Sequence, residues 1–199
     1  MQDLSGPAAA GPLDARVSES SRATGREAEF ERLVLPHRSR MMRAIWRVLH
    51  DPDLAEEALQ ESLAILWRKL PAVNRHPNPA ALILRIAVQS ACDQLRALRR
   101  RRGRFVPLDE AGGSAAAASE DLVVTNERRE MVLNAISRLG RRQATAFMLR
   151  AVQGESYEAI AASLGCSEAT ARVHVMRARE KLRRWLGVPS AAPGSEDSP

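Results

Sequence analysis

The chain has 199 residues, of which 45% are hydrophobic and 4% aromatic, so it can build one large core or two small aliphatic ones. Its net charge of +6 and its pI near 10.5 favour a polyanionic partner, although an arginine-rich genome would raise the pI in the same way. Two isolated cysteines, Cys92 and Cys166, argue against a disulfide framework or a zinc knuckle. No apolar run is long enough to span a bilayer.

Three segments have the composition of an unfolded chain. The N-terminal tail, 1–26, is rich in Ala, Gly, Pro and Ser and lacks the pattern of a secretory signal, so we expect a cytoplasmic protein without membrane insertion. The C-terminal tail, 187–199, has a similar composition, and 105–126 combines Pro, Gly and an alanine run, as linkers do. Two folded parts remain, 27–104 and 127–186.

The first folded part is predicted to be helical. A stripe of apolar residues at helical spacing is interrupted at Pro36, where we expect a kink or a short break. The next helix can be capped by Asp51 or Asp53, and its acidic first turns suit the helix dipole. The segment 71–79 contains three prolines and is predicted to be a loop, and a third helix begins near Pro79 and ends in a run of arginines.

The second folded part reads as four helices, at roughly 127–138, 141–152, 156–164 and 168–186. No strand-type alternation occurs anywhere in the sequence. We therefore predict an all-α fold of two small helical bundles joined by a flexible linker.

A helix-turn-helix is predicted near the end of the second part. Ser156 can cap a short helix, Gly165 can end it in the left-handed conformation, and Ser167 can cap the longer helix that follows. A short helix, a tight turn and a long helix in this order are typical of DNA-binding proteins.

The long helix presents one face away from its predicted core. The buried stripe is formed by Ala171, Val175, Ala178 and Leu182. The residues that point outward or flank the outer face and could contact DNA are Arg172, Val173, Met176, Arg177 and Arg179. Arginines suit guanine edges or phosphates, and apolar side chains suit thymine methyl groups.

Charge favours this interpretation over a solvated basic helix with two stray apolar residues. From Arg138 to Arg184 there are ten basic residues against four acidic ones, a balance that equals the net charge of the whole chain. Such a concentration is the electrostatic footprint expected of a surface that binds phosphates.

Three segments in order resemble one group of bacterial proteins: "DPDLAEEALQESLAILW", "ALILRIAVQSACDQLRALRRR" and "SYEAIAASLGCSEATARVHVMRAREKL". The chain from about Phe30 to Leu186 is similar to the extracytoplasmic-function sigma factors, which direct core RNA polymerase to promoters. The resemblance implies −10 melting by the first bundle, −35 recognition by the second, and no cofactor or catalytic residue. The partners it implies are promoter DNA, core polymerase at its β′ clamp helices and β flap, and a candidate anti-sigma factor. It also implies a monomer when free.

The resemblance assigns a polymerase-binding role to part of the second helix. The pattern from Ala55 to Glu61 matches the family's core-binding helix, and places Glu57, Gln60 and Glu61 against the clamp helices. Acidic residues favoured by the helix dipole on a solvated face are the competing interpretation.

The resemblance also assigns −10 contacts. In the loop these are Asn74, Arg75, His76 and Asn78, whose polar groups could bond the edge of a flipped base. On the following helix they are Arg85, Gln89, Arg96, Arg99 and Arg100. Leu82 and Gln89 replace the family's usual Trp and Asn, and a plain surface loop with a solubilising helix end is the alternative.

In the last helix the family's −35 contacts match Arg172, Val173, Met176 and Arg177, the same face that helical phasing turns outward. A stand-alone helix-turn-helix regulator that binds DNA without polymerase is the alternative function, and a protein that only sequesters polymerase is a third class. An enzyme is disfavoured, because the four histidines are scattered and no HExxH motif, phosphate loop or nucleophile elbow occurs. We predict no metal site.

Overall fold

The computed structural model describes residues 24–104 and 120–188, and every regular element within these ranges is helical. The predicted all-α fold is confirmed. The chain up to Pro36 and the chain from His37 onward form two compact units, which are described separately.

The first unit contains one helix, over residues 24–33. This helix begins inside the predicted tail, 1–26, the rest of which lies outside the described residues. The short 3-10 turn η1 (Leu35–His37) follows and contains Pro36. The predicted break is confirmed, because a proline ring clashes with the preceding helical turn and supplies no N–H donor.

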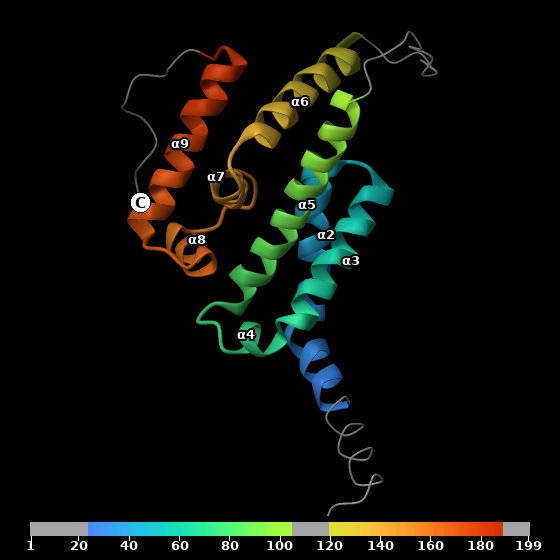
Figure 1. The fold of residues 1–199 in the computed structure, drawn as a ribbon, viewed down its shortest axis with the longest axis vertical. Helices are drawn as coiled ribbons and strands as arrows, with labels where there is room; N and C mark the ends of the chain where they lie inside the picture. The colour runs from blue at the N-terminus through green and yellow to red at the C-terminus, as the bar shows by residue number, and fades with distance from the viewer. Residues whose placement is uncertain (1–23, 105–119, 189–199) are drawn as a thin grey trace, which may run out of the picture. The chain divides into compact units, whose positions relative to one another are not determined.

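In the second unit, three helices form the first bundle: α2 (Arg38–Leu49), α3 (Pro52–Arg68) and α5 (Pro79–Arg104). Each pair among them is in contact, and the three ribbons are labelled α2, α3 and α5 in Figure 1. Their largest fully buried side chains are Met41, Ile45, Leu59, Leu66, Ile83 and Leu84. Small buried residues such as Ala44, Ala58 and Ala87 let the helices approach closely, as the alanine-rich composition predicts.

A sharp corner connects α2 to α3. His50 ends α2 with φ 50° and is the one non-glycine residue in the left-handed region within the described ranges. The Asp51 side chain then accepts a hydrogen bond from the Leu54 N–H at 2.9 Å, and Pro52 occupies the first turn of α3. Asp51 is therefore the N-cap, and of the two predicted candidates Asp53 only contributes charge to the first turn.

The segment 71–79 is only partly a loop, so the prediction that its prolines exclude a helix is wrong. The short helix α4 (Leu70–Asn74) includes Pro71 in its first turn. Backbone N–H groups in a first turn have no acceptor within the helix, so the absence of one from proline breaks no helical hydrogen bond. Leu70 and Val73 are fully buried and anchor α4 to the bundle. The irregular backbone is confined to 75–78.

The second bundle consists of α6 (Glu120–Arg138), α7 (Arg141–Phe147), the π-helical turn η2 (Met148–Val152), α8 (Tyr157–Leu164) and α9 (Glu168–Leu186). Helix α6 begins within the predicted linker, 105–126. The remaining linker, 105–119, lies outside the described residues. Helix α5 contacts α6, α7 and α8 as well as the first bundle.

The predicted helix over 141–152 changes its hydrogen bonding half way along. The Gln153 N–H donates to the Met148 carbonyl at 3.1 Å, which is the i→i+5 bond of a π-helix. Met148 and Leu149 are both buried in this turn. Because the apolar pattern of a π-helical turn resembles that of an α-helix over five residues, periodicity does not separate the two.

The buried residues of the second bundle include Leu133, Ile136, Leu139, Met148, Leu149, Ile160, Val175 and Leu182. Helix α6 is also tied to α9 by a cation–π contact, in which the Arg138 Cζ atom lies 4.5 Å from the Trp185 ring centroid.

The cap at the corner between α2 and α3 gives a stability prediction. Replacing Asp51→Ala removes the acceptor for the Leu54 N–H, so we expect the free energy of unfolding to fall by about 1 kcal/mol. Asp53→Ala is the matched control, because it removes a carboxylate two residues away without removing a cap bond. Urea denaturation followed by circular dichroism measures both, and an equal or larger loss for Asp53→Ala would contradict the assignment of the cap.

Candidate nucleic-acid interface

The turn between α8 and α9 is stabilised by two sets of hydrogen bonds. Gly165 has φ 63°, and its N–H donates to Ala162 at 3.3 Å while the Cys166 N–H donates to Ala161 at 3.1 Å, a Schellman arrangement. Ser167 then accepts from the Thr170 N–H at 3.2 Å and starts α9. The predicted caps at Ser156, Gly165 and Ser167 are confirmed. The α8–α9 pair is a helix-turn-helix.

Helix α9 divides its side chains as the periodicity predicts. The buried residues are Ala171, Val175, Ala178 and Leu182. The exposed residues include Arg172, Val173, Met176, Arg177 and Arg179, and Met176 is 52% exposed. Because Met176 is so accessible, it contributes little to the hydrophobic core of the isolated chain. The outward face is therefore available for a partner, and its contact with DNA stays a prediction.

Arg172 has two neighbours that periodicity does not single out. Its guanidinium donates to the Glu168 carboxylate through Nη2 at 2.7 Å and through Nε at 3.2 Å. Its Cζ atom also lies 4.3 Å from the ring centroid of Tyr157, at the start of α8, and Arg150 contacts the same ring at 4.7 Å. Glu168 could have been found as an i, i+4 pair, whereas the contact with Tyr157 spans 15 positions and leaves no local signal.

His174 lies half-buried on α9. Both of its ring nitrogens are buried and have no hydrogen-bond partner among the described residues. Burial lowers the pKa of His174 from its ordinary value of 6.5, and the nearby cations of Arg142 and Arg177 lower it further. The histidine is therefore held neutral within a basic surface at neutral pH.

The predicted base-reading loop makes several internal bonds. The Asn78 side chain accepts from the Ala81 N–H at 3.0 Å and so acts as a cap for α5. The His76 Nε2 atom donates to the Ala162 carbonyl at 3.1 Å. Arg75 is exposed, and its Nε donates to the Pro71 carbonyl at 3.0 Å. Asn74 is exposed at the end of α4.

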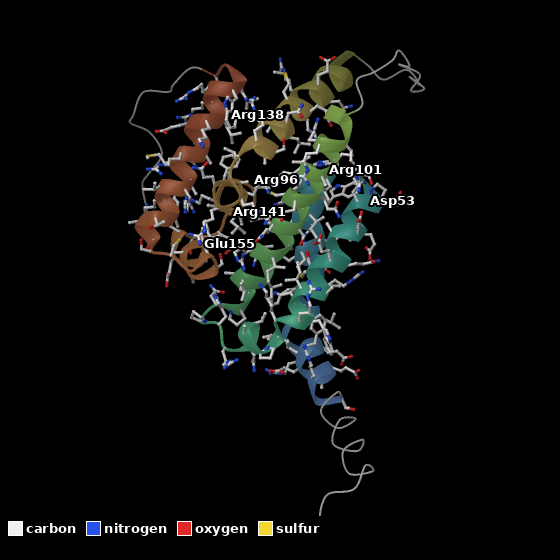
Figure 2. The ribbon with its side chains drawn as sticks, in the orientation of Figure 1. Asp53, Arg96, Arg101, Arg138, Arg141 and Glu155 are labelled. Carbon is white, nitrogen blue, oxygen red and sulfur yellow. The ribbon has the colours of Figure 1, made fainter. Side chains whose placement is uncertain are left out.

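The predicted basic residues of α5 are in part paired with other residues. Arg96 donates to Asp93 at 2.7 Å and to the Leu139 carbonyl at 3.1 Å, and Arg141 of α7 contacts the same Asp93 carboxylate at 3.2 Å. Figure 2 labels Arg96 on α5 and Arg141 on α7. Arg99 forms an ion pair with Glu130 of α6. Arg100 is exposed.

One cavity is lined in part by three of the residues that we predict to contact the −10 element. His76, Arg85 and Gln89 line a space of 510 Å³ together with Arg141 and Arg142 of α7. Arg85 donates to Gln89 at 2.9 Å, and burial lowers the pKa of Arg85. Three arginines around one space make it attractive to anions.

The predicted polymerase-binding residues share the solvent side of α3. Glu57, Gln60 and Glu61 are all exposed, whereas Ala58 and Leu59 between them are fully buried. This exposure is compatible with a protein partner on that face.

Neither cysteine forms a disulfide, and burial raises the pKa of the Cys92 thiol to about 12, so the thiol carries no charge at neutral pH. Among the described side chains, no group of three His, Cys, Asp or Glu could hold a metal ion. None of the helices that the structure describes is long and apolar enough to cross a membrane.

Comparison with known proteins identifies both bundles. Residues 33–101 match the family model described as Sigma-70 region 2. Residues 129–182 match the model described as Sigma-70, region 4. The two matches follow in the order of the bundles, and the second includes the helix-turn-helix.

Several curated proteins are similar to the chain over most of their length. RNA polymerase sigma-H factor of Pseudomonas aeruginosa is 28% identical over 81% of this chain and 88% of its own. RNA polymerase sigma factor CarQ of Myxococcus xanthus is 29% identical, over 82% and 92% respectively. ECF RNA polymerase sigma-E factor of Escherichia coli K12 is 29% identical, over 79% and 86%.

Among solved structures, the chain is similar to the sigma factor RpoE in its complex with the anti-sigma factor NepR from Bartonella quintana. The identity is 22% and the TM-score 0.46, over 81% of this chain and 98% of that one.

The position of His174 gives a pH prediction. Because its pKa is lower in the folded chain than its ordinary 6.5, the unfolded chain takes up the proton first, and stability is lost as the pH falls through about 6.5. We expect the urea midpoint of the wild-type chain to drop between about pH 8 and about pH 5.5, and that of His174→Gln to drop less. Some dependence should remain, since burial and Arg129 lower the pKa of His50 too. Equal drops in both proteins would contradict the prediction.

Proposed function

Because this chain belongs to the extracytoplasmic-function group of bacterial sigma factors, which direct RNA polymerase to promoters, we propose that its two bundles divide the recognition of a promoter. The first bundle would bind core polymerase and the −10 element, and the second would bind the −35 element. The observation that carries the second half is the outward face of α9, where basic and apolar side chains lie exposed on a capped helix-turn-helix.

The outer face of α9 would enter the major groove. The groove is about 12 Å wide and admits a helix, and each base pair presents a distinct pattern of donors, acceptors and methyl groups there. Arg172 and Arg177 would bond guanine edges or phosphates, and Val173 and Met176 would contact thymine methyl groups. Arg179 would bind the backbone and add to the salt dependence.

The loop after α4 would capture an unstacked base of the −10 element. Extruding a base from the duplex costs a few kcal/mol, and hydrogen bonds and stacking between the base and the loop would have to offset this cost. Asn74, Arg75 and His76 carry the groups for this, and the Asn78 amide nitrogen would contribute while its oxygen caps α5. His76 must release the Ala162 carbonyl before its Nε2 can bond a base.

The basic residues of α5 would hold the phosphates near the melted strand. Arg100 is exposed in the chain alone, whereas Arg96 and Arg99 already bind carboxylates. When Arg96 and Arg99 bind phosphates, each would exchange a carboxylate partner for a phosphate. This exchange costs less free energy than leaving the guanidinium without any anionic partner. Arg85 and Gln89 would contribute from the same helix.

Core polymerase would meet the chain at two places. Glu57, Gln60 and Glu61 would face the β′ clamp helices. On the second bundle, an apolar hollow of 240 Å³ lined in part by Phe147, Leu182 and Leu186 would suit the β flap. An anti-sigma factor is a further partner that the family implies.

Neither bundle has to bind tightly alone. Core polymerase and the linker would hold the two DNA-binding surfaces at a fixed separation, so that binding at one raises the effective concentration at the other.

Arginine removal from the outer face of α9 tests the −35 assignment. We expect Arg172→Ala with Arg177→Ala to abolish promoter-dependent abortive transcription by sigma-free core polymerase supplied with the chain, because the loss of two charged contacts costs about 2–6 kcal/mol. Arg38→Ala with Arg43→Ala removes the same charge from α2 and serves as the control.

Two results would count against this assignment. Full activity of the double variant would show that other residues read the −35 element. Absence of transcription with the wild-type chain, combined with sequence-specific duplex binding by the chain alone, would point instead to a stand-alone regulator.

Charge reversal on α3 tests the polymerase contact. Glu57→Lys with Glu61→Lys places two cations where the clamp helices would meet two carboxylates, so we expect the affinity for core polymerase to fall at least tenfold, by about 1.4 kcal/mol or more. Fluorescence anisotropy of the labelled chain titrated with core measures it. Glu127→Lys with Glu180→Lys, exposed sites on α6 and α9, is the matched control, and equal losses in both double variants would argue for a non-specific charge effect.

A further inference from the structure

Tyr157 joins three elements around the helix-turn-helix. It is the first residue of α8, half-buried, and its ring is contacted by Arg150 of η2 and Arg172 of α9. The Cζ atoms lie 4.7 Å and 4.3 Å from the ring centroid, within the range of about 6 Å over which a cation is attracted to an aromatic face.

Arg172 is held but not buried. Glu168 accepts from its Nη2 and Nε, which fixes the plane of the guanidinium from one turn earlier in α9. Tyr157 contacts the same group from another helix. The Arg172 side chain nevertheless remains 54% exposed, so a DNA base or phosphate can still reach it.

Such fixing matters because a free arginine side chain loses much rotational entropy when it is immobilised. A side chain that already has one orientation loses less on binding, and the difference appears as affinity and as selectivity for the partner that fits this orientation. A salt bridge to Glu168 alone on an exposed helix face would be a weak restraint. The ring adds a second point of contact that does not depend on the conformation of α9 side chains.

We propose that Tyr157 is a positioning residue for −35 recognition, acting through the guanidinium of Arg172. The inference rests on the proposed function, in which Arg172 contacts the −35 element. It extends the determinants of promoter choice from the outer face of α9 to a residue on the preceding helix.

A double-mutant cycle tests the coupling between the two residues. The full chain is assembled with core polymerase, and the probe is a promoter duplex selected by the wild-type holoenzyme from a library randomised over the −35 region. Tyr157→Leu, Arg172→Ala and the double variant are compared with wild type by equilibrium binding at fixed salt. We expect Tyr157→Leu to weaken binding about fivefold in the wild-type background, and to have no further effect when Arg172 is already alanine.

Two further variants separate positioning from packing. Tyr157→Phe keeps the ring and should bind within about twofold of wild type. Tyr157→pentafluorophenylalanine keeps the shape of the ring but reverses the charge distribution of its face, so it should weaken binding like Tyr157→Leu even though the core is filled. Tyr157→Leu should also relax discrimination at the same base pair as Arg172→Ala, a readout that lost packing alone would not reproduce.

Each failure has a distinct signature. If Tyr157→Leu weakens binding equally in both backgrounds, Tyr157 acts independently of Arg172 and the proposal is wrong. If the fluorinated ring binds like wild type, the contact with the cation has no role. If Arg172→Ala itself leaves binding and base preference unchanged, the proposed contact of Arg172 with the −35 element is wrong, and this result is distinct from a failure of Tyr157 alone.

Discussion

Between α8 and α9 the chain turns over three residues, and the geometry of the proposed DNA-binding face of α9 depends on this turn. Gly165 adopts a left-handed backbone that costs other residues about 1–2 kcal/mol, and Ser167 at once caps the next helix. With both ends of the turn fixed by hydrogen bonds, the angle between α8 and α9 is fixed as well. The outward direction of Arg172 and Arg177 follows from that angle and from the helical period.

The core of the second bundle keeps this surface rigid from behind. Ala171 and Ala178 are fully buried, so α9 lies close against its neighbours without large side chains between them. The cation–π contact between Arg138 and Trp185 adds a restraint at the far end of α9. Basic residues thus serve two roles in this bundle, since Arg138 holds helices together while Arg177 lies exposed on the surface.

Strong local signals explain which features could be predicted from the sequence. The ends of α8 and α9, their caps and the phase of α9 follow from Ser, Gly and an uninterrupted apolar stripe. The loop predicted over 71–79 was partly wrong, because the sequence does not distinguish a proline in the first turn of a helix from a proline in a loop. The π-helical turn at Met148 leaves no mark on the apolar pattern. The bond from His76 to Ala162 and the contact of Tyr157 with Arg172 depend on tertiary packing and leave no signal in the local sequence. The Asn78 cap is different, because it joins residues three positions apart, and an Asn before Pro79 at the start of α5 is a local signal for it.

The division of α9 into two faces also bears on how such a protein can change. Val173 and Met176 contribute nothing to the buried stripe, so substitutions there leave the fold almost untouched. After a gene duplication, one copy could therefore drift toward a new target sequence through a few surface substitutions while both copies remained folded. Gly165 and Ser167 have less freedom, because the left-handed residue and the N-cap set the turn that orients the whole outer face of α9.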